Sequence, residues 1–456
     1  MKIVRIGAAQ GFYGDALEPA IVSAKRGDIQ YLAFDCLAEL TMAILAKDQA
    51  KDPNKGYTRD ITPAMQYLLP IAKDKGFKML TNAGGINPEG ALQEVLRIAN
   101  KLGLHGLRVA VVTGDNLMGR LDELQESVLT LEDLETGEKL GTVKDRLMFA
   151  NAYLGAQPIV EALKQGADVV ITGRTTDTAQ FLAPLIYEFG WSQEDWNELA
   201  QGILMGHLME CSGQSTGGNF SGCWWELKDL DLIGYPIAEV REDGSFVLTK
   251  PEETGGLVSV DTVKEQMLYE IHDPTAYVTP DVIADFTTAT LEDIGPDRVL
   301  VRGATGKHRP DSLKVVMGYE NGYMGQAMVG YSWPDALRKA RAAEEIIRKQ
   351  LQRRGWEYEE VHAEYLGFNS LHGPTVEEPQ EELNEVYLRM TVRAKTREDA
   401  DRFGRLFPYL ALNGPPSLGG SFGTLTSRQL LGMWSTLIPR EMVEREIKIR
   451  IEEVSV

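Results

Sequence analysis

The residues best suited to chemistry stand where a predicted strand ends. Val169–Ile171 is a continuous β-branched run that stops at Gly173, and Arg174 and Asp177 follow directly. Such a run is typical of a strand buried on both faces. In open parallel sheets, ligands bind beyond the carboxyl ends of the strands, beside helix N-termini that attract anions. The pair is therefore predicted to line a ligand site; the alternative is an ion pair that only fixes the corner.

Further polar residues follow the other predicted strands, so one sheet edge is expected to gather them. These candidate substrate-binding and catalytic residues are Asp15, Asp35 with Glu39, Asn82 with Gly84 and Gly85, and Asp115, and Asn151 is added although no predicted strand directly precedes it. Asp35 and Glu39 share a helix face if the helix has already begun. Paired carboxylates can then divide acid and base roles. The alternative is that Asp35 only caps that helix.

A second group lies in His207-Leu-Met-Glu-Cys211, where helical spacing puts His207, Glu210 and Cys211 on one face. A histidine with a carboxylate and a thiol suits acid–base or nucleophilic catalysis. The segment has no CxxC or HExxH partner, so no metal is predicted. A histidine that is simply packed in the core is the alternative.

Glycine-rich turns supply candidate binding groups. Gly84 and Gly85 before a helix permit close approach to a phosphate or carboxylate. Gly217, Gly218 and Asn219 could present N–H donors to an oxyanion, and Lys250 could add local positive charge. Neither G-x-G-x-x-G nor G-x-x-x-x-G-K-[ST] occurs, which disfavours nicotinamide binding and nucleotide hydrolysis. No cofactor is expected, except coenzyme A as part of a substrate.

The first 200 residues alternate predicted strands with helices, which is typical of parallel βαβ units. The strands are predicted at 3–7, 31–34, 78–81, 108–113 and 169–171. The predicted fold class is α/β, with a mostly parallel, open, Rossmann-like sheet and helices on both faces. A closed barrel is the alternative.

The remainder of the chain is predicted to differ. Residues 201–310 form a glycine-rich connector that completes the cleft, with a hairpin over 235–250 that turns at Glu242-Asp-Gly244. Residues 311–456 begin with a second hairpin around Glu320-Asn-Gly322. From residue 323 the order is βαββαβ, ending with a strand at 446–454, which predicts a ferredoxin-like α+β domain.

Composition narrows the partners and the compartment. The chain has 456 residues and a net charge of −20, which disfavours nucleic acid and anionic membranes as partners. Its three cysteines lack paired spacing, so reduced thiols are expected. No apolar stretch reaches about 18 residues, and the N-terminus is charged, so a cytoplasmic protein is expected.

Several segments taken together resemble the acyclic terpene utilisation AtuA family over about residues 3 to 450. They are Gly7-Ala-Ala-Gln-Gly-Phe-Tyr-Gly-Asp15, Ile171-Thr-Gly-Arg-Thr-Thr-Asp177, Gly206-His-Leu-Met-Glu-Cys211, Thr216-Gly-Gly-Asn-Phe220, Gly234-Tyr-Pro-Ile-Ala-Glu239 and Tyr269-Glu-Ile-His-Asp-Pro274. Members accompany acyl-CoA carboxylases, dehydrogenases and CoA transferases of branched-acid breakdown. The resemblance implies a step on a branched acyl-CoA or carboxylic acid. Some relatives carry a further small C-terminal domain, which is not expected in this chain.

The leading hypothesis is a hydratase or lyase that needs no redox cofactor and acts on a small acyl-CoA or carboxylate. Asp35 with Glu39, or His207 with Glu210, would exchange the proton, and Arg174 with the glycine loops would hold the substrate oxygen. A thioester or amide hydrolase using Cys211 and His207 is a second hypothesis. The third is a non-catalytic subunit that binds acyl-CoA. A homo-oligomer is expected.

Overall fold

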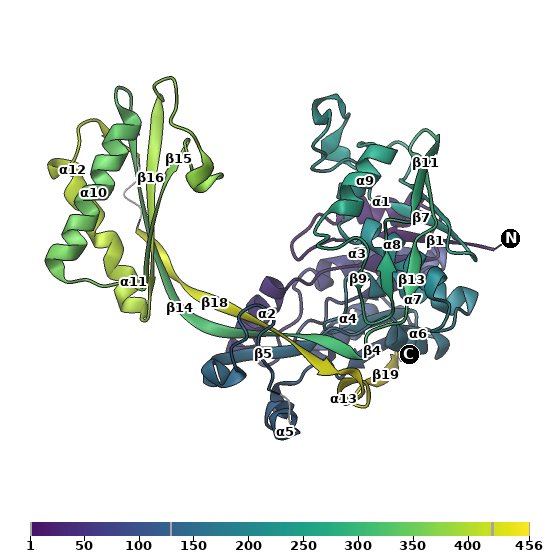
Figure 1. Ribbon diagram of the computed structural model, residues 1–456. Helices are drawn as coiled ribbons and strands as arrows, with labels where there is room; N and C mark the ends of the chain where they lie inside the picture. Colours follow the sequence, from purple (N-terminus) through teal and green to yellow (C-terminus); the bar gives the residue numbers. More distant parts are fainter. Residues whose placement is uncertain (1, 128–129, 421–423, 456) are drawn as a thin grey trace. The chain divides into compact units, whose positions relative to one another are not determined.

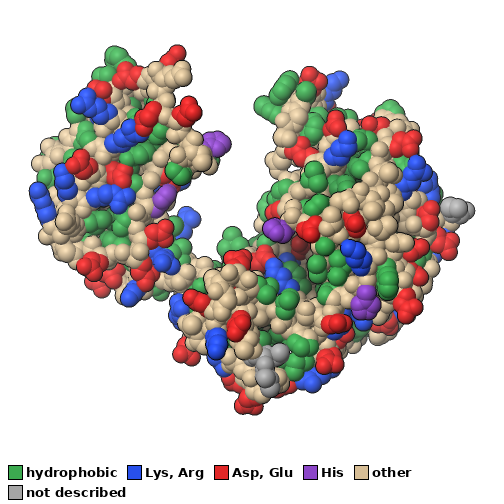
Figure 2. Space-filling model, in the orientation of Figure 1, with side chains coloured by type: hydrophobic (Ala, Val, Ile, Leu, Met, Phe, Trp, Pro, Cys, Tyr) green, Lys and Arg blue, Asp and Glu red, His purple; other side chains and the backbone are tan. Residues whose placement is uncertain are grey.

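The chain forms two compact units. The structure, a computed structural model, describes residues 2–127, 130–420 and 424–455. The first unit comprises Met1–Gly318 with Met433–Val456, and the second comprises Tyr319–Gly432 (Figure 1). All residues predicted to take part in chemistry belong to the first unit. Acidic and basic side chains are interspersed on the surfaces of both units (Figure 2).

A ten-stranded sheet with the order β11-β12-β8-β7-β1-β2-β3-β6-β4-β19 organises the first unit. Its five adjacent parallel strands are β1 (Ile3–Ala8), β2 (Tyr31–Phe34), β3 (Lys78–Thr81), β6 (Val169–Thr172) and β4 (Arg108–Thr113). The antiparallel strands are β7 (Ile237–Arg241), β8 (Phe246–Thr249), β12 (Arg298–Arg302), β11 (Thr290–Gly295) and β19 (Lys448–Glu453). The five predicted strands are confirmed, but the sheet is mixed rather than mostly parallel, because β7, β8, β12 and β11 extend one side of it and the single strand β19 extends the other.

Burial explains the parallel centre. Every residue of β2 and β6 is buried, as expected for strands covered on both faces. Two separate groups of helices contact the sheet. One group is α1 (Glu18–Arg26), α3 (Ile61–Lys75) and α4 (Pro88–Lys101), and the other is α6 (Gln157–Lys164), α7 (Ala179–Phe189) and α8 (Trp196–Glu210). Residues 199–210 of α8 are all buried, so this helix carries polar side chains into the interior.

The smaller elements complete the first unit. They are α2 (Glu39–Lys51), α5 (Leu121–Glu126), α9 (Val260–Leu268), α13 (Arg440–Glu444), and the three-stranded sheet of β13 (Thr305–Lys307), β10 (Ile283–Asp285) and β9 (Tyr277–Val278). The hairpin predicted over 235–250 is confirmed as β7 and β8, and Gly244 at its turn has a φ of 78°. Among the described residues, no helix combines the length and apolarity needed to cross a bilayer.

The hairpin predicted around Glu320-Asn-Gly322 is wrong. One continuous strand, β14 (Ser312–Ser332), runs through these residues. Its second half pairs with β16 (Glu385–Ala394) from Tyr323 to Ser332, and β14 also pairs with β5 (Leu147–Ala152) and β18 (Thr424–Pro439). Local turn propensity is weak compared with so many long-range backbone hydrogen bonds, which keep the chain extended.

The second unit contains the order strand, helix, strand, strand, helix, strand. Its sheet has the order β15-β16-β14-β17, with β15 at Glu360–Leu366 and β17 at Leu418–Gly419. The helices are α10 (Ala336–Arg354), α11 (Arg397–Phe403) and α12 (Leu410–Asn413). The strand predicted to close this unit, 446–454, lies elsewhere: it is β19, which pairs with β4 in the first unit. A strand pattern shows that a segment is extended but does not identify its partner.

Replacement of Gly84 by alanine should destabilise the first unit. A Cβ atom at Gly84 would lie 2.4 Å from the carbonyl oxygen of Thr172, a backbone atom at the end of β6. We expect Gly84→Ala to lower the free energy of unfolding by about 1–3 kcal/mol. Gly119→Ala is the matched control, because a Cβ there meets nothing within 4 Å. Urea unfolding of both variants checks this, and equal stabilities would contradict the packing seen at the β6 corner.

Candidate functional site

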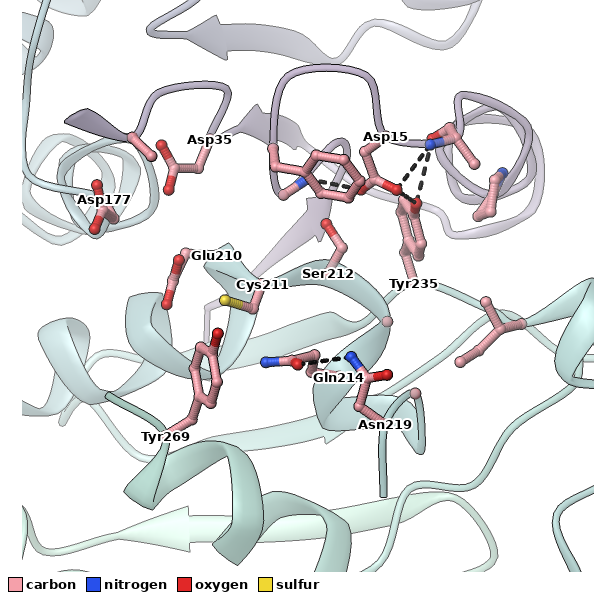
Figure 3. Close-up of a pocket in the computed structure, with 18 of the residues that line it drawn as sticks. Asp15, Asp35, Asp177, Glu210, Cys211, Ser212, Gln214, Asn219, Tyr235 and Tyr269 are labelled. Atoms are coloured by element: carbon pink, nitrogen blue, oxygen red, sulfur yellow. Dashed lines mark hydrogen bonds between the residues drawn. The ribbon is translucent and has the colours of Figure 1, made fainter. Parts of the chain in front are cut away.

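A cavity of about 1340 Å³ opens in the first unit beyond the ends of β1, β2 and β6 and beside the C-terminus of α8 (Figure 3). The predicted residues that line it are Asp15, Asp35, Glu39, Arg174, Asp177, Glu210, Cys211, Gly218 and Asn219. The strand-end group and the α8 group, far apart in the sequence, therefore face one cavity. The predicted residues that do not line it are Asn82, Gly84, Gly85, Asp115, Asn151, His207, Gly217 and Lys250.

Three carboxyl groups converge at one end of the cavity. Asp35, Asp177 and Glu210 each place an oxygen within 4.8 Å of the other two. Burial is the main cause that raises the pKa of all three, and their mutual repulsion raises it further for Asp35 and Glu210. Asp177 remains accessible, with 38% of its side chain exposed. The cluster can therefore hold shared protons close to a ligand.

The same three oxygens are of the kind that bind hard divalent cations such as magnesium. They are the only group of three or more histidine, cysteine or carboxylate side chains with such spacing in the described part of the chain. The sequence prediction of no metal is untested and stays a prediction.

Arg174 is the cation of this cluster. Its side chain is 2% exposed, and Nη1 donates to the Leu37 carbonyl oxygen at 2.7 Å and to Asp177 Oδ1 at 3.0 Å. The guanidinium lies over the Tyr153 ring, 4.1 Å from its centroid. Arg174 and Asp177 form an ion pair that fixes the corner, and both residues also line the cavity. The two alternatives predicted for the pair, a ligand site and a structural ion pair, are therefore compatible. Because the planar guanidinium of Arg174 is held by Leu37 and Tyr153, its hydrogen bond orients the Asp177 carboxylate.

A second layer of polar residues holds this corner from behind. Asp115 is buried and accepts from the Arg174 backbone N–H at 2.8 Å and from Asn151 Nδ2 at 2.7 Å. Asn82 donates from Nδ2 to Asp35 Oδ1 at 2.5 Å. The strand ends do gather these side chains, but Asp115, Asn151 and Asn82 position other residues and do not reach the cavity.

The predicted glycine donors are already engaged. The N–H groups of Gly217 and Gly218 donate to the carbonyl oxygens of Gln214 and Gly213, at 3.2 and 2.8 Å, so neither N–H points to a ligand. Gly84 and Gly85 are packed against Thr172 and Leu45. Their small size is used for chain packing rather than for a bound anion.

Lys250 does not supply charge to the cavity. It is buried, and its Nζ donates to the Thr254 carbonyl oxygen at 2.8 Å and lies 3.2 Å from Asp297. Its charge is therefore balanced by Asp297, in the turn between β11 and β12.

Asp35 and Glu39 do not share a helix face. The helix α2 begins at Glu39 after Ala38, so Asp35 lies in the preceding loop. Asp35 does not cap α2 either, because no side chain does so. Glu39 accepts from the Tyr153 hydroxyl and lies 3.4 Å from Lys314 Nζ. Burial alone would raise the pKa of Glu39, but Tyr153 and Arg174 lower it to about 2, so Glu39 is a stable anion.

His207 is packed behind Glu210. Its Nε2 contacts the Gln266 carbonyl oxygen at 2.9 Å, its ring lies against Tyr277 and Phe286, and Nδ1 is 3.6 Å from Glu210 Oε1. Burial lowers the pKa of His207 to about 4, so the imidazole is neutral at physiological pH. His207 is therefore a histidine packed in the core, with Nε2 hydrogen-bonded and the buried Nδ1 without a hydrogen-bond partner among the described residues.

Cys211 is not set up as a nucleophile. Burial and the neighbouring Glu210 raise the pKa of its thiol far above the ordinary value, so the thiol stays protonated. No hydrogen bond to His207 is found for it among the described residues. A Cys–His pair of the kind that activates a thiolate is therefore missing from this site.

Sequence reasoning missed several residues of the cavity wall, which are Tyr153, Ser212, Gln214, Tyr235, Tyr269 and Lys314. Tyr153 and Lys314 meet because β5 pairs with β14, and the Tyr153 N–H donates to the Lys314 carbonyl oxygen at 2.9 Å. No local signal reveals such a pairing. Tyr235 and Tyr269 do stand within the segments that carry the family resemblance, which was the one signal available.

The model of the "Acyclic terpene utilisation family protein AtuA" matches residues 4–449. The chain belongs to the AtuA family. None of the curated proteins matches it. In this AtuA chain, the matched region includes both groups of cavity residues, those at the strand ends and those at the C-terminus of α8.

The buried Asp115 should make stability depend on pH. Burial raises its pKa from 3.8 to about 6. A raised carboxyl pKa stabilises the folded state below the unfolded pKa, and this contribution is lost as the pH rises through 6. We expect the unfolding free energy of the wild type, relative to Asp115→Asn, to fall by about 2–3 kcal/mol between pH 4 and pH 7.

Urea unfolding at several pH values measures this difference. Asn151 Oδ1 has no hydrogen-bond partner, so its amide can rotate to accept from the amide introduced at position 115. If the difference in unfolding free energy between the wild type and Asp115→Asn does not change with pH, burial does not raise the pKa of Asp115.

Proposed function

We propose that this AtuA protein is an enzyme that adds or removes water on a branched carboxylic acid or its acyl-CoA thioester, without a redox cofactor. The observation that carries the proposal is the convergence of Asp35, Asp177 and Glu210 in one cavity beside Arg174. Carboxyl groups with raised pKa values can donate and accept protons near neutral pH, as acid–base catalysis requires.

Asp35 and Glu210 are the proposed proton-exchanging pair. In hydration, one carboxylate takes a proton from water while the water oxygen bonds to the β-carbon, and the other carboxyl gives its proton to the α-carbon. Elimination reverses these transfers. Arg174 holds Asp177 and partly balances the cluster's charge, and Glu39 stays ionised beside Lys314. Asn82 positions Asp35 from behind.

Two other functions are less well supported. A thioester or amide hydrolase would need Cys211 as a thiolate, whereas its thiol pKa is raised and His207 is turned toward Gln266. A non-catalytic acyl-CoA-binding subunit would not need three repelling carboxyl groups in its cavity, because burying them costs stability.

We also propose a finer description of the architecture. The five parallel strands with their two groups of helices support a Rossmann-like core. The sheet order β15-β16-β14-β17 with α10 and α11 supports a ferredoxin-like second unit, which we propose assembles copies into a homo-oligomer. A separate role for residues 201–310 in completing the cleft, and action in the cytoplasm, belong to the same proposal.

Neutralising the proton-exchanging pair should abolish turnover. Asp35→Asn and Glu210→Gln keep the shape of each side chain but remove its proton exchange. Each is expected to lower the rate of hydration about 10²–10⁴-fold. The measurement is incorporation of heavy oxygen from labelled water into branched enoyl thioesters, followed by mass spectrometry.

Glu135→Gln is the control, since Glu135 is exposed and lies outside the cavity. Circular dichroism and thermal melts confirm folding. If folded Asp35→Asn and Glu210→Gln both support full turnover in the reconstituted pathway while deletion of the protein stops it, a scaffold is favoured.

Substitution of Cys211 separates the lyase from the hydrolase. We expect Cys211→Ser to retain turnover, because a half-buried, neutral thiol contributes packing rather than nucleophilic attack. A covalent acyl adduct on Cys211 in the wild type, trapped by rapid acid quench and seen by intact-protein mass spectrometry, would instead support the hydrolase.

A further inference from the structure

The cavity has two ends of different character, and the second end is not used by the chemistry proposed above. In Figure 3, Asp35, Asp177 and Glu210 lie on one side, Cys211 and Ser212 lie between, and Asp15, Tyr235 and Asn219 lie on the other side. The volume of about 1340 Å³ exceeds the roughly 300–1,000 Å³ of common small-molecule sites. The cavity therefore has room for a ligand that extends beyond the carboxyl cluster.

We propose that the second end, formed by Val22 of α1 and residues 230–233, holds the hydrocarbon chain of an aliphatic thioester. This inference rests on the proposed function and names its substrate class. Leu230, Leu232 and Ile233 precede Tyr235 by a few residues, and Val22 follows Asp15 into α1, so these side chains belong to the Asp15–Tyr235 end.

The apolar side chains at this end are open to solvent. Leu230 and Leu232 are 42% and 64% exposed, although both line the cavity. Ile233 is anchored, because it packs where Cβ atoms on Gly213 or Gly218 would each meet its Cδ1 at 3.4 Å. Adjacent exposed aliphatic side chains inside a cavity indicate a surface that an apolar ligand covers.

Several charged residues of this end have partners. Asp15 accepts from the Tyr235 hydroxyl at 2.8 Å and from the Gly11 and Ala16 N–H groups at 2.9 and 2.7 Å. Arg26 lies 3.7 Å from Glu253. Glu18 and Asp231 also line the cavity, and Asp231 stands between Leu230 and Leu232 in the sequence. The aliphatic side chains are the part of this end that gains from contact with an apolar ligand.

The acidic end selects the reacting group. A free carboxylate entering beside Asp35, Asp177 and Glu210 would meet three carboxyl groups and one guanidinium. A thioester carbonyl is uncharged and can accept a hydrogen bond from a protonated carboxyl. The polarity of the two ends therefore points to a thioester whose acyl chain runs from the carboxyl cluster toward residues 230–233.

The test uses N-acetylcysteamine thioesters of butanoic, hexanoic and octanoic acid, which differ only in acyl length. We expect the affinity measured by calorimetry to rise about 10- to 100-fold over the four added methylenes. Leu232→Gln should remove most of this rise while leaving the butanoyl probe's affinity unchanged. Leu134→Gln, at a position 54% exposed and outside the cavity, is the matched control and should behave as the wild type.

Two results would overturn the inference: an affinity that does not depend on acyl length, or an unchanged length dependence in folded Leu232→Gln. A sodium octanoate affinity equal to that of the octanoyl thioester would overturn the choice of a neutral reacting group. If binding depends on acyl length but enoyl thioesters are not hydrated, the proposed function is wrong and this inference still holds. The two failures can therefore be distinguished.

Discussion

The arrangement of the site depends on one electrostatic constraint, the convergence of three carboxyl groups, two of them buried, beside a single guanidinium. Asp35, Asp177 and Glu210 repel one another, and taking them out of water is costly unless protons or cations balance their charge. Arg174 can offset only part of this charge, and it is itself held by the Leu37 carbonyl, Tyr153 and Asp177. A protein that keeps such a cluster keeps it at an energetic cost, which is the pattern of a functional site.

The surrounding structure maintains this cluster from three directions. The loop after β2 is fixed by Asn82, which binds Asp35, and the corner after β6 is fixed by Asp115, which binds the Arg174 backbone. Glu210 arrives on α8, a helix buried along most of its length. Hydrogen bonds thus hold the loops that carry Asp35 and Asp177, and Glu210 lies on a helix. Sharing of protons or binding of a cation can then balance the charge of the cluster.

The second unit, Tyr319–Gly432, is inserted between two segments of the chain that both belong to the first unit. The strand β14 begins in the first unit, where Lys314 joins the cavity wall, and continues into the sheet of the second. The chain returns through β18, and β19 completes the edge of the ten-stranded sheet beside β4. One extended strand therefore contributes both to the cavity wall and to the second unit, which strands of the ordinary five or six residues are too short to do.

Patterns along the chain were sufficient for the local elements and for the gathering of the strand-end residues. The β-branched run before Gly173, the glycine stops and the 235–250 hairpin each reflect interactions within a few residues, and the structure contains them. Local patterns also placed Arg174, Asp177 and Glu210 among the candidates. They could not tell that Asp115 and Asn151 face away from the cavity, since that depends on which strands lie side by side.

The sequence by itself determined the strand and helix positions in the first 200 residues, the residue types at the strand ends and the membership of the AtuA family. Only the tertiary structure decided that β14 passes straight through Glu320-Asn-Gly322, that β19 belongs to the first unit, and that His207 is packed while Glu210 reaches the cavity. The physical reason is that strand pairing and burial are fixed by contacts between segments tens to hundreds of residues apart. Such contacts outweigh local propensity and leave no periodic trace in the chain.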